Sequence, residues 1–155
     1  MARAETADYD EYVLEVEFDP DGSPGTFSTI CGLTDVTGNH TSNMETSEIP
    51  DCDDEGLPFA IARAVRSQEV TISATGVWAR QSNHRVMSWW RSATTLNTRL
   101  RNANAEANGA VDDIYGETGP AFLVSVSNSR TKGQKVTAEV EIQFDGLPDT
   151  ETVTA

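Results

Sequence analysis

A cluster of carboxylates in the segment IPDCDDEG is the part of the chain best equipped for chemistry by residue type alone. It consists of Asp51, Asp53, Asp54 and Glu55. Hard cations need many oxygen ligands, and a calcium loop adds a glycine and a distal bidentate Glu at fixed spacing. Because the distal Glu is missing, the sequence favours a solvated or partner-facing acidic loop over a metal site. We expect no cofactor.

The remaining reactive side chains are isolated from one another in the sequence. His40 and His84 have no Cys or carboxylate at zinc-ligand spacing. Neither Cys31 nor Cys52 lies in a motif that activates a nucleophile, and there is no phosphate-binding glycine loop. We therefore predict that the protein is not an enzyme, and that its function lies in its surfaces.

Alternation of apolar and polar residues is the dominant pattern of the chain, and it predicts antiparallel strands. For residues 96–101, the competing interpretation is that the preceding helix extends to Leu100. The predicted strands are 12–18, 26–31, 65–78, 96–101, 122–126 and 136–144.

One helix is predicted over residues 82–93. Ser82 or Asn83 supplies an N-cap, and apolar side chains then recur at helical spacing. The buried stripe that this spacing predicts is Val86, Trp89, Trp90 and Ala93.

The 155 residues fit one domain that is large enough to bury a core. We expect an N-terminal arm at 1–11, a β-domain at 12–147 and a polar tail at 148–155. Segments 34–62 and 102–119 read as long loops, although part of the first, around Val36 or Met44 to Ile49, fits an extended arm or hairpin. The predicted fold is mainly β: an antiparallel sandwich or barrel of six to seven strands with one flanking α-helix.

Charge is distributed unevenly along the chain, whose net charge is −14. Residues 1–62 carry fifteen acidic residues and one basic residue, whereas residues 63–111 carry seven basic and two acidic residues. The acidic total argues against a sequence-reading nucleic-acid binder. The asymmetry suits head-to-tail assembly of identical copies, and solvated strand faces are the alternative. No apolar run approaches the ~20 residues that span a bilayer.

With these elements in place, the chain resembles the tail tube (major tail) proteins of tailed bacteriophages and gene transfer agents. The resemblance covers about 9–148 and includes the opening strand YVLEVEF and the closing hairpin FLVSVSNSRTKGQKVTAEVEIQFDGLP. Its most specific part is IPDCDDEG followed by AVRSQEVTISATGVW, which is similar to non-contractile tail tubes.

The resemblance implies a structural virion protein that self-assembles as hexameric rings, stacked into a tube through which DNA is ejected. It implies further partners in the tape measure, tail terminator and baseplate or distal tail proteins, with DNA only in transit and no membrane. It also implies assembly in the host cytoplasm and a final place in the virion tail. Segment 34–62 would be the assembly loop.

Within that framework, two sets of side chains are candidates for contacts in the tube. An acidic or small polar lining would let DNA slide without sticking. The candidates for facing the lumen are Glu15, Glu17, Thr71, Ser73, Thr75, Glu139, Glu141 and Gln143. The candidates for contacts between subunits are Asp51, Asp53, Asp54, Glu55, Arg63, Arg66, Arg99 and Arg101.

The alternative function is a monomeric β-sandwich binding module, carbohydrate-binding or adhesin-like, on a virion or cell surface. Such a module presents aromatic side chains on one strand face. Trp89 and Trp90 are instead predicted on a helix, which fits that function poorly.

Overall fold

The computed structural model describes residues 3, 6, 9–103 and 114–152. Most of the expected N-terminal arm, the centre of the expected loop 102–119 and the last three residues lie outside this part. In chain order the elements are η1 (Tyr9–Glu11), β1 (Tyr12–Val16), β2 (Ser28–Thr29), β3 (Leu33–Ile49), β4 (Ala60–Val77), α1 (Arg80–Ser92), β5 (Leu96–Asn102), β6 (Ile114–Ser129), β7 (Thr137–Phe144) and β8 (Asp149–Thr152).

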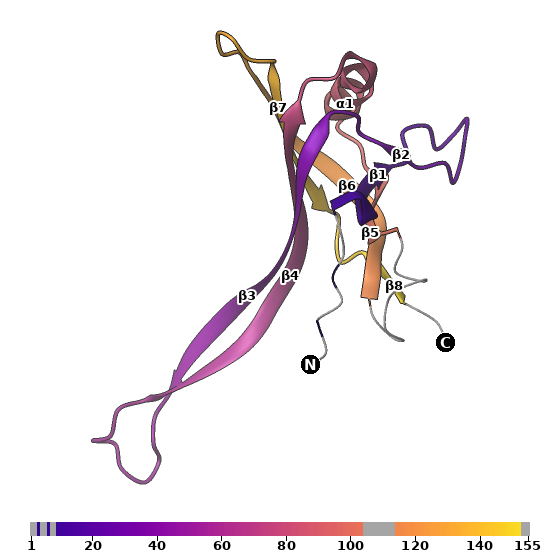
Figure 1. Ribbon diagram of the computed structural model, residues 1–155. Coiled ribbons are helices and arrows are strands. Elements are labelled where there is room, and N and C mark those ends of the chain that lie inside the picture. Colours follow the sequence, from indigo (N-terminus) through magenta and orange to yellow (C-terminus); the bar gives the residue numbers. More distant parts are fainter. Residues whose placement is uncertain (1–2, 4–5, 7–8, 104–113, 153–155) are drawn as a thin grey trace.

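All eight strands belong to one antiparallel sheet that folds over on itself (Figure 1). Its order is β2-β1-β5-β6-β7-β4-β3, with β8 also paired to β6. The first half of β6 pairs with β5 and β8, and its second half pairs with β7, so this one strand runs through both halves of the sheet. A strand that passes from one layer to the other is how sandwich-like folds make their corners.

The predicted fold class is confirmed: the chain is mainly β, antiparallel, with one flanking α-helix in its described part. The described residues form eight strands instead of six or seven, because β3 lies in a segment that was predicted as a loop and β8 was not predicted. A strand as short as β8, with four residues, is too brief to show a period in the sequence. The expected polar tail therefore begins with a strand, β8, that pairs with β6.

The core lies between the two halves of the sheet and is made of the apolar faces of its strands. The competing helical interpretation of the stretch after residue 96 is wrong, because β5 pairs with both β1 and β6. The buried apolar residues are Leu14, Val16, Ile30, Val70, Ile72, Ala74, Val86, Trp89, Leu100, Ala121, Leu123, Val140, Ile142 and Phe144.

Helix α1 begins two residues before the predicted start and ends one residue before the predicted end. The predicted N-cap is wrong: Ser82 lies inside the first turn, and its hydroxyl donates to the carbonyl of Cys31 (2.9 Å), while Ala79 precedes the helix without a side-chain cap. Ala93 adopts a left-handed conformation (φ 54°), which ends the helix.

Only half of the predicted helix stripe is buried. Val86 and Trp89 belong to the core, whereas Trp90 is 46% exposed and Ala93 is exposed. The buried positions are Ser82, Val86 and Trp89, so their spacing of four and three residues defines the inner face. Trp90 lies about 100° around the helix from Trp89, and it therefore points away from the sheet.

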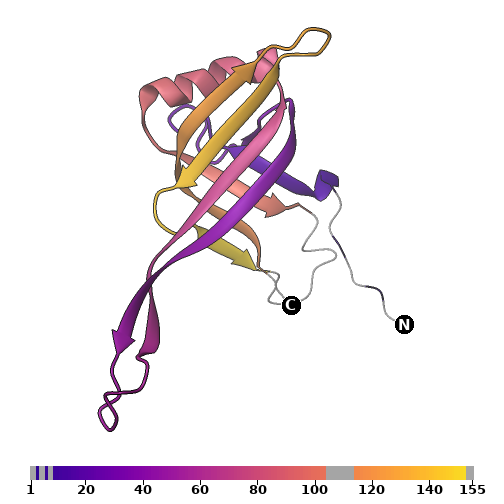
Figure 2. The ribbon, with the colours of Figure 1, turned by 90° about the vertical axis from the view of Figure 1, so that its left-hand side faces the viewer.

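Strands β3 and β4 form a hairpin that projects beyond the rest of the molecule (Figures 1 and 2). Strand β4 pairs with β7 only from Thr71 onward, so residues 41–69 form a two-stranded ribbon, which we call the arm. The expectation of a long loop over 34–62 is wrong for most of that segment, since only residues 50–59 connect the strands. A ribbon open to solvent on both faces needs few apolar residues, and this is why the segment resembled a loop.

Candidate assembly surfaces

The strands β3, β4, β7 and β6 present one broad face with no other element in front of it (Figure 2). The pairing places Thr71 opposite Gln143, Ser73 opposite Glu141 and Thr75 opposite Glu139. Six of the eight lumen candidates therefore lie on this surface, which we call the outer face. Its side chains include Asp35, Thr37, Glu69, Thr71, Ser73, Thr75, Glu139, Glu141 and Gln143.

The outer face is acidic and rich in hydroxyl groups. The strand segments that form it, 35–41, 69–75, 122–129 and 137–143, contain no Lys or Arg. The hydroxyl of Thr75 donates to Asp35 (3.4 Å), and the amide of Gln143 donates to Glu141 (3.4 Å). Asp35 and Glu141 are therefore each linked to a neutral neighbour on the same face, and the strand segments that form the face supply no cation.

The other two lumen candidates lie on or next to β1, away from the outer face, and both are engaged within the chain. Glu15 accepts a hydrogen bond from Arg99 (2.5 Å) and lies 3.5 Å from Arg101. Glu17 is 6% exposed and accepts a hydrogen bond from the backbone amide of Gly25 (2.9 Å). Their carboxylates serve the packing of the β1–β2 hairpin and of β5.

The basic candidates fall into two groups. Arg99 and Arg101 are partly buried by the ion pairs with Glu15, and Arg99 also lies over the ring of Phe27 at 4.3 Å. Arg63 and Arg66 are exposed on the arm. The four basic candidates therefore form no common surface.

The acidic candidates lie together at the end of the arm, in the connection between β3 and β4. Asp51 accepts hydrogen bonds from the backbone amides of Asp53 (2.8 Å) and Asp54 (3.3 Å), and Asp54 accepts one from Gly56 (3.0 Å). These bonds stabilise the turn. Among the described residues, no group of three or more His, Cys, Asp or Glu side chains is arranged to hold a metal ion.

A basic surface, only part of which belongs to the basic segment 63–111, lies at the opposite end of β4 from the arm. Residues 77–95, which include α1, carry three arginines and no acidic residue. The turn between β6 and β7, residues 129–137, carries three basic residues and no acidic one. Val77 pairs with Thr137, so both segments lie at the same end of the sheet. No acidic residue occurs from 70 to 105 in a chain with 25 acidic residues, and this run was the available signal.

A polar contact closes the open side of the folded sheet near the base of the arm. The imidazole of His40 on β3 contacts the carboxylate of Glu117 on β6. The ring of Tyr12 lies beside Gly38 on β3, where a side chain would collide with its hydroxyl. Burial, and secondarily the charge of Glu117, raises the pKa of Tyr12 above its usual value.

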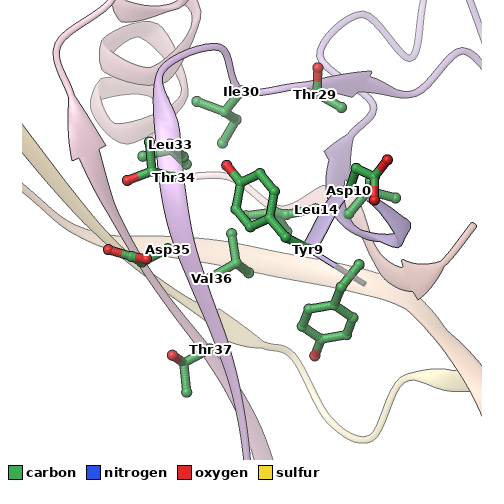
Figure 3. Close-up of a pocket in the computed structure, with 12 residues that line it drawn as sticks. Tyr9, Asp10, Leu14, Thr29, Ile30, Leu33, Thr34, Asp35, Val36 and Thr37 are labelled. Atoms are coloured by element: carbon green, nitrogen blue, oxygen red, sulfur yellow. The ribbon is translucent and has the colours of Figure 1, made fainter. Parts of the chain in front are cut away.

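A groove between β1, β2 and β3 lies beside Tyr12 and has a volume of about 370 Å³ (Figure 3). Its lining is apolar and hydroxyl-rich, with Leu14, Ile30 and Val36 at its base. The carboxylates of Asp10 and Asp35 lie on opposite sides of the view, and no His, Cys, Lys or Arg lines the groove. It holds no pair of groups suited to acid–base or nucleophilic catalysis.

No helix in the part of the chain that the structure describes has the length and apolar character needed to cross a membrane.

Known tail proteins share this architecture. The chain resembles the tail of an empty gene transfer agent particle, refined with C6 symmetry, with a TM-score of 0.69 and 14% identity over 95% of this chain and 100% of that one. For the virion of a native gene transfer agent particle the TM-score is 0.66, with 14% identity and coverage of 95% and 100%. For the tail tube of SPP1 it is 0.65, with 12% identity and coverage of 96% and 82%.

The sequence comparisons match this chain to a family and to no individual curated protein. No curated protein sequence matches the chain. The family model for phage tail tube proteins matches residues 11–150, which is most of its length. The resemblance predicted from the sequence is thereby confirmed, together with a structural instead of a catalytic role. The chain belongs to the phage tail tube protein family.

Proposed function

We propose that the protein forms hexameric rings that stack into the tube of a non-contractile tail, and that DNA passes through this tube. Family membership supports the tube role, and the C6 symmetry of the similar gene transfer agent tail supports six copies per ring. The outer face forms the lining of the lumen in this proposal. The side chains concerned are Thr71, Ser73, Thr75, Glu139, Glu141 and Gln143.

The observation that carries the proposal is the composition of the outer face. Asp35, Glu69, Glu139 and Glu141 lie among hydroxyl and amide groups, and the segments that form the face have no Lys or Arg. Basic side chains would bind DNA phosphates and hold them, whereas carboxylates repel them at a distance. An acidic, hydroxylated lining therefore repels the DNA backbone, so that DNA slides through the tube without binding to its wall.

The width of the face agrees with a ring of six copies. Four strands about 4.8 Å apart span about 19 Å, so six copies side by side close a cylinder of about 115 Å circumference and about 37 Å backbone diameter. Tilting the strands, as closed barrels do, widens that cylinder further. After side chains are subtracted, the remaining space admits one DNA duplex.

The ends of such a tube require other proteins. We propose that the protein contacts the tape measure inside the tube, and the terminator and distal tail proteins at its two ends, during assembly in the host cytoplasm. A similar solved chain is described as the cap that terminates a tube in the anti-feeding prophage (TM-score 0.63, 12% identity). That likeness supports the proposal that a different protein of the same fold binds to the end of the tube and closes it.

The test is to reverse charge on the outer face while keeping assembly intact. We expect particles with Glu139→Lys and Glu141→Lys to build sixfold tails of normal length by cryo-electron microscopy, and to deliver much less DNA to recipient cells. The matched control reverses two exposed acids outside these strands, Asp10→Lys in η1 and Asp21→Lys before β2, and should deliver normally. Normal delivery by the first variant contradicts an acidic lumen, and tails without sixfold symmetry contradict the ring.

A further inference from the structure

A hollow that the proposed lumen does not involve lies between α1 and residues 17–27, which connect β1 to β2. Its volume of about 520 Å³ is within the range of about 300–1,000 Å³ that small-molecule sites occupy. Helix α1 packs on the inner residues of β6 and β7, among them Val126 and Val140. The hollow therefore lies on the opposite side of the sheet from the outer face (Figure 2).

The hollow has an aromatic floor and one basic wall. The ring of Phe18 is half-buried and meets the edge of the Trp89 ring, with centroids 6.4 Å apart. The guanidinium of Arg85 lies over the Phe18 ring, 5.5 Å from its centroid, where the electrons of the ring hold a cation in place. His84 precedes it on the exposed side of α1. Among the described residues, no carboxylate forms an ion pair with Arg85 or His84.

The wall opposite α1 is held in shape by hydrogen bonds within the connection. The side chain of Asp19 accepts a hydrogen bond from the amide of Gly22 (2.9 Å), and Glu17 accepts one from the amide of Gly25 (2.9 Å). Hydroxyl groups line the hollow from both walls, and in the described part of the chain they make no hydrogen bond with another residue. They therefore remain free for a ligand. These hydroxyls belong to Ser23, Thr26, Ser28 and Ser88.

Together these features favour an anionic saccharide over other small ligands. A sugar ring has apolar C–H groups on its face and hydroxyls on its rim, which suit an aromatic floor with hydroxyl side chains around it. A wholly apolar ligand would leave those hydroxyls without partners, and an inorganic ion would make no use of the aromatic floor. The guanidinium of Arg85 adds a preference for a carboxylate or phosphate, to which it donates charge-assisted hydrogen bonds.

We propose that the hollow between α1 and the β1–β2 connection binds one unit of an anionic saccharide, with Arg85 on its carboxylate or phosphate and the surrounding hydroxyls on its ring. This binding goes beyond the proposed conduit for DNA, because the hollow faces away from the outer face. In a tube of many copies the same weak site recurs in every subunit. Many such sites that engage one polysaccharide bind it far more tightly than a single site does.

The test titrates the free subunit with four probes and follows its backbone amides by nuclear magnetic resonance. Glucuronate and glucose 6-phosphate are the anionic sugars, glucose is the neutral sugar, and inorganic phosphate is the anion without a sugar. We expect both anionic sugars to shift the amides of residues 18–28 and 84–92 in a saturable way. Glucose and inorganic phosphate should each bind at least about tenfold more weakly, since each lacks one part of the recognition.

Two variants assign the binding to this hollow. Arg85→Gln removes the charge, so glucuronate should bind it no more tightly than glucose does. Ser88→Leu fills the hollow from an exposed position of α1 and should abolish binding of both sugars without lowering the melting temperature. Arg91→Gln is the matched control, because Arg91 is an exposed arginine of the same helix that does not line the hollow. It should bind like the wild type.

Assembled tubes provide the second measurement. We expect wild-type tubes to retain soluble polygalacturonate, a carboxylated polysaccharide, when they are sedimented, and tubes of Arg85→Gln to retain several-fold less. The proposal is overturned if glucose or inorganic phosphate binds as tightly as glucuronate, or if Arg85→Gln and Ser88→Leu bind like the wild type. Binding by the free subunit that is lost in tubes also overturns it, because the hollow is then covered between copies.

Discussion

Trp89 and Trp90 are neighbours in the sequence, yet they have different environments. The indole nitrogen of Trp89 donates to the carbonyl of Thr94 (3.1 Å), and its ring meets the edge of Phe18 with centroids 6.4 Å apart. Trp90 is turned toward solvent. The energetic role of each ring therefore follows from helix geometry, and the residue type alone does not reveal it.

We expect Trp89→Ala to lower the free energy of unfolding by about 3–5 kcal/mol, because it leaves a cavity between α1 and the sheet. Trp90→Ala should change it by less than about 1 kcal/mol, as for other exposed side chains. Urea denaturation of the two single variants measures both values. Equal losses would mean that the helix does not pack on the sheet through Trp89.

Tyr12 makes the stability of the fold sensitive to alkaline pH. Burial, with the charge of Glu117, raises its pKa above the usual value of about 10. Above pH ~10 the unfolded chain loses the phenol proton while the folded chain keeps it, so stability falls as pH rises from there to the folded pKa. Tyr12→Phe should flatten this alkaline slope in melting curves between pH 9 and pH 11, values that bracket the usual pKa of about 10. Tyr9→Phe, at a residue 73% exposed, is the matched control and should keep the slope.

Among the elements, the arm has the least support from the rest of the fold. Its two strands pair only with each other over residues 41–69, and an isolated two-stranded ribbon is marginally stable in water. Every residue from 41 to 61 is exposed. The arm therefore adds little to the stability of the free subunit, and we propose that it acts in contacts with other molecules.

Removing the arm should separate folding from assembly. Ser42 lies directly opposite Gln68, so an Asn-Gly turn can replace residues 43–67 and join the strands as a tight hairpin. We expect the melting temperature to change by only a few degrees and tube formation to be lost. Electron microscopy and calorimetry of the same preparation check both outcomes. If the shortened protein formed tubes of normal length, the arm would not be required for assembly.

On the scale of the whole molecule, charge is segregated along the long axis of β4. The tip of the arm is acidic and the opposite end is basic, while the outer face of the sheet is acidic without basic neighbours. The charges within each surface repel one another, so we expect segregation of this kind to act between copies. The segregated charges make the two ends of the molecule different, and a stack of identical copies with different ends has a polarity.

Assembly should therefore depend on ionic strength. The screening length falls from about 10 Å at 0.1 M salt to about 3 Å at 1 M. We expect the rate of tube growth, followed by light scattering, to fall several-fold over this range, while the melting temperature of the free subunit changes little. Growth that is unaffected by salt would assign assembly to apolar contacts alone.

Much of the fold is predictable from local patterns in the sequence. In β1 and β7, side chains that alternate in the sequence alternate in the structure, with Leu14, Val16, Val140 and Ile142 buried. The pattern works because successive residues of a strand point to opposite faces whatever the strand pairs with. Strand β6 is confirmed, but its buried residues include Leu123, whereas Phe122 and Val124 of the predicted set are exposed, since the register shifts between Leu123 and Ser125.

The remaining features of the fold and of its surfaces depend on pairings between segments that are far apart in the sequence. The β class, the helix, the acidic segment and the family were all predictable without knowing which strands pair. Only the tertiary structure turned a predicted loop into the arm, gathered six candidates into the outer face, and engaged Glu15 and Glu17 inside the chain. The basic surface combines residues 77–95 with residues 129–137. These segments meet because β4 pairs with β7, and Val77 lies opposite Thr137, 60 residues later in the sequence. Such contacts depend on which strands meet, and local periodicity carries no information about that choice.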